Sequence, residues 1–129
     1  MMRLHFIAIG GSAMHSLAIA MQLLGHKVSG SDDAIYDPSR SNLEASGLLP
    51  INLGWFPEKI NPEVDIVILG MHAKRDNPEL LEAQKKGLKM QSYPEFVAAR
   101  SQTKSRVVIA GSHGKTTITS MILYVLHYH

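Results

Sequence analysis

The chain has 129 residues, of which 45% are hydrophobic and 19% charged, a composition typical of one soluble globular domain. Its 13 basic and 11 acidic side chains are spread along the sequence, so no block of charge points to nucleic acid. Cysteine is absent, and the seven histidines form no metal-binding pattern, which argues against a disulfide framework and a resident structural metal. Without a membrane-length apolar run or a signal-peptide pattern, the sequence predicts a cytoplasmic protein.

Strand-like and helix-like segments alternate along the chain. Strands are predicted at residues 4–9, 26–31, 64–69 and 88–92, and helices at residues 14–24, 38–46, 77–86 and 94–100. Asn77 and Pro78 supply an N-cap and a first residue for the third of these helices. The alternation predicts an α/β fold with a Rossmann-like, doubly wound parallel sheet and ligand sites at the carboxyl ends of the strands.

The turn after the first predicted strand has the spacing of a dinucleotide-binding fingerprint. Residues 8–13 read Ala-Ile-Gly-Gly-Ser-Ala, with alanine at the first and last glycine positions. Asp32 ends the second strand, where an acidic side chain normally binds ribose hydroxyls. These residues predict a diphosphate at the start of the following helix. A simple tight turn at Gly10 and Gly11, and a solvated turn at Asp32 and Asp33, remain the alternatives.

The loop that follows the strand at residues 64–69 carries three candidate cations. His72, Lys74 and Arg75 lie at the same strand end as the glycine turn and can face the same diphosphate. Cationic side chains on a loop can equally be solvated, so both interpretations stay open.

A second glycine turn near the end of the sequence resembles a shortened P-loop, G-x-x-G-K-T. An apolar strand is predicted at residues 106–110 before it, and a helix is predicted from residue 118 onward. Main-chain amides of such a turn bind phosphate, Lys115 neutralises it, and the Thr116 hydroxyl can reach Mg²⁺. Ile109 stands where the usual spacing has a further glycine, and an ordinary helix start is the alternative.

The polar linker at residues 101–105 suggests a boundary between two domains. We expect residues 1–104 to form one domain and residues 105–129 to begin a second, truncated domain that binds ATP. One strand and one helix cannot bury their own apolar faces, so we expect residues 118–128 to expose apolar surface and promote self-association.

Together these motifs resemble the N-terminal part of the Mur ligases of peptidoglycan synthesis. The resemblance is carried by residues 6–14 (FIAIGGSAM), 28–32 (VSGSD), 77–79 (NPE) and 111–117 (GSHGKTT), and it extends over the whole chain. It implies a three-domain, ATP-dependent ligase with a UDP-binding N-terminal domain, a central ATPase domain and a C-terminal domain for the amino acid or peptide acceptor. Residues 54–58 and 70–73 favour members that join UDP-N-acetylmuramate to a recycled tripeptide over those that add L-alanine.

The resemblance also implies which residues bind each ligand. Those expected at the UDP-sugar are Gly10, Gly11, Ser12, Ala13 and Met14 at the diphosphate, Asp32 near the ribose or uracil, and His72 and Ala73 in the same cleft. Those expected at ATP are Gly111, Ser112, His113, Gly114, Lys115, Thr116 and Thr117. Lys115 and Mg²⁺ on Thr116 would stabilise the transferring phosphoryl group. The other metal and acceptor ligands would lie downstream, so the chain alone is expected to be inactive.

Two other functions fit parts of the sequence. Residues 4–32 alone suit a NAD-dependent dehydrogenase, although such an enzyme has no use for a second phosphate loop at Lys115. A non-catalytic module that binds a UDP-sugar is the other alternative.

Overall fold

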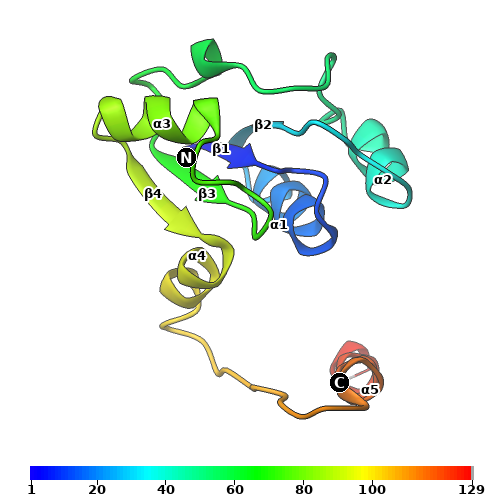
Figure 1. Cartoon of the computed structure of the whole chain (residues 1–129). Coiled ribbons are helices and arrows are strands. Elements are labelled where there is room, and N and C mark those ends of the chain that lie inside the picture. The colour runs from blue at the N-terminus through cyan, green and yellow to red at the C-terminus, as the bar shows by residue number, and fades with distance from the viewer. Residues whose placement is uncertain (129) are drawn as a thin grey trace. The chain divides into compact units, whose positions relative to one another are not determined.

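The computed structural model describes residues 1–128, and within them four parallel strands form one sheet (Figure 1). The strands are β1 (Arg3–Ile7), β2 (Lys27–Ser31), β3 (Ile66–Leu69) and β4 (Lys89–Ser92), in the order β2-β1-β3-β4. Because β2 lies on one side of β1 and β3 on the other, the chain changes direction across the sheet at β1. Ligands of open α/β sheets bind at such a switch point, beyond the carboxyl ends of the strands.

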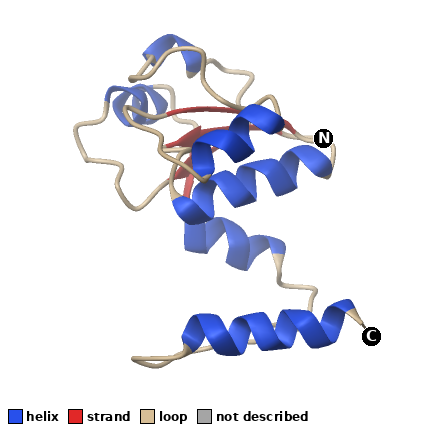
Figure 2. Cartoon of the chain, turned by 90° about the vertical axis from the view of Figure 1, so that its right-hand side faces the viewer, coloured by secondary structure: helices blue, strands red, loops and turns tan. Residues whose placement is uncertain are grey.

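Helices pack on both faces of this sheet (Figure 2). They are α1 (Ser12–Leu23), α2 (Ser39–Ala45), the 3-10 turn η1 (Pro57–Lys59), α3 (Pro78–Lys85) and α4 (Tyr93–Arg100). One core cluster joins Phe6 and Ile68 of the sheet to residues of α1, α2 and α4, including Phe96. The other joins Ile7 and Val67 to residues of α3 and the η1 region. Alternate residues of one strand therefore serve opposite faces.

The α/β fold and the parallel sheet predicted from the sequence are confirmed. Each predicted strand and helix between residues 3 and 100 is present, with boundaries that differ by one to a few residues. The Asn77 side chain caps α3, because its Oδ1 accepts hydrogen bonds from the amides of Glu79 (2.9 Å) and Leu80 (3.2 Å). The η1 turn was not predicted, since its Pro-Glu-Lys sequence carries no apolar periodicity.

The strand predicted at residues 106–110 is wrong. Residues 105–110 contain no strand, and Val107 and Val108 expose 71% and 87% of their surface. An extended segment becomes a strand only when a neighbour accepts and donates its main-chain hydrogen bonds, and the four paired strands all lie between residues 3 and 92.

The chain divides into two compact units, Met1–Ala99 and Arg100–His129. The second unit holds α5 (Lys115–His127), which has no buried side chain. Its exposed apolar residues include Met121, Leu123, Val125 and Leu126. None of the helices within residues 1–128 combines the length and the apolar character needed to cross a membrane.

Candidate functional site

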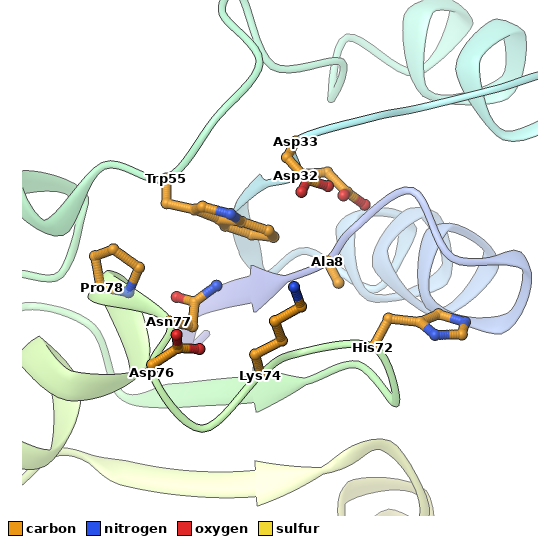
Figure 3. Close-up of a pocket in the computed structure, with 9 residues that line it drawn as sticks. All are labelled: Ala8, Asp32, Asp33, Trp55, His72, Lys74, Asp76, Asn77 and Pro78. Atoms are coloured by element: carbon orange, nitrogen blue, oxygen red, sulfur yellow. The ribbon is translucent and has the colours of Figure 1, made fainter.

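A pocket of about 340 Å³ lies at the carboxyl ends of β1, β2 and β3, where the sheet changes direction (Figure 3). Its lining residues are Ala8, Asp32, Asp33, Trp55, His72, Lys74, Asp76, Asn77 and Pro78. The loop that follows each of these three strands lines the pocket, and this is where the fold is expected to bind a ligand. We call this cavity the switch-point pocket.

Asp32 connects the switch-point pocket to the glycine turn after β1. Its Oδ2 accepts a hydrogen bond from the Gly10 amide at 2.8 Å, and the Asp32 side chain and main chain are together only 7% exposed. Burial raises the pKa of Asp32 above its usual value, and the amides of Gly10 and Ala34 oppose this effect without cancelling it. The Asp32 carboxylate therefore holds the glycine turn in place and also lines the switch-point pocket.

The turn itself leaves no space for a larger residue at its centre. A Cβ atom on Gly10 would lie 2.8 Å from Asp32 Oδ2 and 2.9 Å from Ile35 Cγ1, so only glycine fits without movement. Ala8, at the first glycine position of the fingerprint, has φ of 68°, a left-handed conformation that costs an L-residue free energy. The turn thus has the geometry of the glycine-rich motif even where alanine replaces glycine.

The start of α1 is oriented to receive an anion. Gly11 is its N-cap, and within the described residues no side chain caps the helix and no acidic residue lies in its first turn. First-turn amides lack intrahelical partners, so those of Ser12 and Ala13 can bind phosphate oxygens. The Met14 side chain is 4% exposed and belongs to the core, which leaves only its main chain for a ligand.

The loop after β3 brings only some of its predicted residues to the pocket. His72 and Lys74 line it, whereas Arg75 is not among the lining residues and Ala73 packs against the core on the α3 face. Three carboxylates, from Asp32, Asp33 and Asp76, face the single ammonium of Lys74 around the cavity. This acidic lining suits hydroxyl and N–H donors better than it suits phosphate.

The second glycine turn has part of its predicted geometry. Gly111 and Gly114 adopt φ of 146° and 77°, in the left-handed region that glycine favours, and α5 begins directly after Gly114. Lys115 and Thr116 are the first residues of this helix, and residues 111–117 are all exposed. The turn and the helix start are present, but the strand that would support them is not.

Comparison with known proteins identifies the family. Residues 3–104 match the model described as "Mur ligase family, catalytic domain". The chain belongs to the Mur ligase family. The resemblance inferred from the motifs is therefore confirmed, and the switch-point pocket and the first glycine turn lie within the matched residues.

Similar Mur ligases are longer than this chain. UDP-N-acetylmuramate--L-alanine ligase from Carboxydothermus hydrogenoformans is 40% identical over 98% of this chain and 27% of its own length. The murein peptide ligase from Psychrobacter arcticus superposes with a TM-score of 0.85 at 37% identity, covering 99% of this chain and 27% of that one. The UDP-N-acetylmuramate-alanine ligase from Thermotoga maritima has a TM-score of 0.84 at 26% identity, over 98% and 29%. The chain thus spans about a quarter of the curated relatives it matches.

A buried polar cluster that links β1, β2 and α3 of this Mur ligase chain was not predicted. His5 Nε2 donates a hydrogen bond to Glu79 Oε2 at 2.9 Å, and His5 Nδ1 lies 2.9 Å from Ser29 Oγ. The side chains of His5 and Glu79 are fully buried. Glu79 Oε1 accepts from the Phe56 amide at 2.8 Å. Burial alone would raise the pKa of Glu79, but hydrogen bonds from His5, Ser31 and Phe56 outweigh it and leave that pKa below its usual value.

Sequence reasoning also missed several pocket residues. Trp55, Asp76 and Asn77 line the cavity, although Asn77 was interpreted as a helix cap and as part of the resemblance, and Trp55 only as part of the resemblance. Trp55 is the single tryptophan of the chain and lies in an irregular segment between β2 and β3. Its rarity was the available signal, but no motif spacing linked it to the strand ends.

Proposed function

We propose that this chain binds UDP-N-acetylmuramate and forms the N-terminal part of an ATP-dependent Mur ligase that makes an amide bond on that substrate. The diphosphate would lie at Gly10, Gly11 and the first turn of α1, and the nucleoside would enter the switch-point pocket. The two alanine ligases named above carry this substrate in their names, and the residues of this chain supply a site of matching chemistry.

The hydrogen bond between the Gly10 amide and Asp32 carries the proposal. It joins the anion-binding turn and the acidic pocket into one site, with 2.8 Å between the two atoms. A nucleoside diphosphate has the complementary arrangement, with anionic phosphates attached to a ribose whose hydroxyls donate hydrogen bonds. Lys74 supplies positive charge on the side of the pocket across from Asp32 and Asp33 (Figure 3).

The second glycine turn is proposed to bind ATP. Gly114 at φ of 77° and the exposed Lys115 and Thr116 at the start of α5 fit a phosphate and a Thr-bound Mg²⁺. Bound ATP would transfer its γ-phosphoryl group to the substrate carboxylate with ADP as the leaving group, Mg²⁺ would offset the phosphate charge, and an amine would then displace inorganic phosphate from the acyl phosphate. Lys115 neutralises the phosphate charge, and the Thr116 hydroxyl orients the metal.

We propose a peptide rather than L-alanine as the acceptor, on the sequence at residues 54–58 and 70–73. The chain alone is proposed to lack turnover, so the test uses a complete ligase that contains this chain. That ligase should join the tripeptide to UDP-N-acetylmuramate faster than it joins L-alanine. Preference for L-alanine would reverse the assignment, and amide formation by the isolated chain would refute the proposed lack of turnover.

Calorimetric titration tests the substrate. The chain should bind UDP-N-acetylmuramate, and Gly11→Glu should abolish binding because a carboxylate would stand where the diphosphate lies. Gly11→Ala is the matched control, since a Cβ there would lie 3.4 Å from the nearest side-chain atom, an ordinary contact. Binding of NADH in place of the UDP-sugar would support the dehydrogenase alternative instead.

A further inference from the structure

Trp55 gives the switch-point pocket its one large flat wall. Figure 3 shows the indole ring lying across the cavity, between Asp32 and Asp33 on one side and Asn77 and Lys74 on the other. The rest of the lining is mainly polar or charged. An aromatic ring placed beside carboxylates is suited to a ligand that is flat on one side and carries hydrogen-bond donors on the other.

Two main-chain hydrogen bonds fix the segment that carries this ring. On one side of Trp55, the Gly54 amide donates to the Asp32 carbonyl oxygen at 2.8 Å. On the other side, the Phe56 amide donates to the buried Glu79 carboxylate at 2.8 Å. Trp55 itself packs against the core cluster that contains Ile7 and Leu80. The ring is therefore held in place before a ligand arrives, which lowers the entropy cost of binding.

We propose that Trp55 stacks on the pyrimidine base of the UDP-sugar and so acts as a specificity-determining residue. This inference rests on the proposed function. The pocket is at the lower end of the range for small-ligand sites, about 300 to 1,000 Å³, which suits a nucleoside better than a whole UDP-sugar. Asp32 and Asp33 lie beside the ring, where ribose hydroxyls attached to a stacked base would find acceptors. The same carboxylates disfavour phosphate, which leaves the diphosphate at the glycine turn.

Fluorescence excited selectively at tryptophan, at a wavelength where tyrosine hardly absorbs, reports on Trp55 alone, because the chain has one tryptophan. UDP and UDP-N-acetylmuramate should both change its emission, whereas N-acetylmuramate without a nucleotide should not. Emission that responds to N-acetylmuramate but not to UDP would place the sugar against the ring and overturn the proposal. Unchanged emission at saturating UDP-N-acetylmuramate, with binding verified by calorimetry, would overturn it as well.

Substitution measures the contribution of stacking to affinity. Trp55→Leu should weaken binding of UDP and of UDP-N-acetylmuramate roughly 10- to 100-fold, the usual effect of losing one base-stacking ring. Trp55→Phe keeps a flat ring and should retain affinity to within about fivefold. Phe56→Leu is the matched control, because the Phe56 ring belongs to the same segment but contacts Lys59 and does not line the switch-point pocket. This substitution keeps the main-chain amide that donates to Glu79.

The two proposals fail in different ways. Wild-type chain that does not bind UDP-N-acetylmuramate would refute the proposed function, and the stacking role with it. Wild-type chain that binds, with Trp55→Leu binding equally well, would refute only the stacking role. Circular dichroism of each variant verifies the fold, and Trp55→Phe with weakened binding despite a native spectrum would also contradict simple stacking.

Discussion

The two glycine turns of this chain begin from similar local sequences and end in different environments. The turn at residues 8–11 follows β1, whose last four residues are buried, and Asp32, which directly follows the neighbouring strand β2, accepts a hydrogen bond from the Gly10 amide. The turn at residues 111–114 follows a segment that is not a strand, and the residues around it are exposed. Both turns precede a helix, so local signals were sufficient for that feature in each case. The first turn is also fixed by a contact from a distant part of the chain, the Asp32 carboxylate.

Hydrogen exchange should show the largest difference between the two units. The amides of β1 and β3 lie in buried ladders, and we expect them to exchange at least ~1,000-fold more slowly than those of residues 105–117. The measurement is exchange by mass spectrometry with peptide-level resolution. Equal protection in both regions would show that the second unit is as stably packed as the first.

The buried Glu79 should make the stability of the first unit depend on pH. Its folded pKa lies below the usual 4.5, so its contribution is present above that value and is lost as pH falls through the folded pKa. Glu79→Gln should cost about 1.5–3 kcal/mol at neutral pH through weaker hydrogen bonds. The difference from wild type should shrink below pH 4.5 in urea unfolding followed by Trp55 fluorescence.

Asp32 provides a control of opposite sign for that experiment. Because burial raises the pKa of Asp32 in the folded chain, its contribution to the free energy of unfolding is present at low pH and is lost as pH rises through the folded pKa. Asp32→Asn should therefore remove a pH dependence that runs against the one of Glu79. If both variants changed the profile in the same direction, one of the two assignments would be incorrect.

The same substitution in each glycine turn should have unequal effects. Gly10→Ala meets Asp32 and Ile35 at under 3 Å and should destabilise the first unit by about 1–3 kcal/mol. Gly114→Ala meets no atom within 4 Å but must adopt φ of 77°, so it should weaken the start of α5 and leave thermal unfolding of the first unit unchanged. Thermal unfolding followed by Trp55 fluorescence measures the first effect and should not detect the second.

The smallest expected effect is at Ala8. Glycine adopts φ of 68° without strain, but it also adds freedom to the unfolded chain, and these effects nearly cancel. Ala8→Gly should therefore change the free energy of unfolding by less than about 1 kcal/mol, in the stabilising direction. Marked destabilisation in a urea titration would show that the methyl group of Ala8 contributes packing that outweighs its strain.

Much of the first unit could be predicted because its signals are local. Asn77 and Pro78 start α3 through their own side chains, and the apolar run before Leu69 forms β3 as expected. Asp32 was predicted at the ligand, but its bond to Gly10 joins residues 22 positions apart and depends on the pairing of β1 with β2. No local pattern specifies such a contact.

The sequence by itself determined the alternation of strands and helices, the positions of both glycine turns and the family. These features follow from side-chain periodicity, capping and backbone freedom, which act over a few neighbouring residues. Tertiary structure decided that Trp55 faces the pocket, that His5 meets Glu79 from 74 positions away, and that residues 106–110 form no strand. Each of these depends on which distant residues supply a partner, because buried polar groups and strand edges need hydrogen bonds that their own neighbours cannot provide.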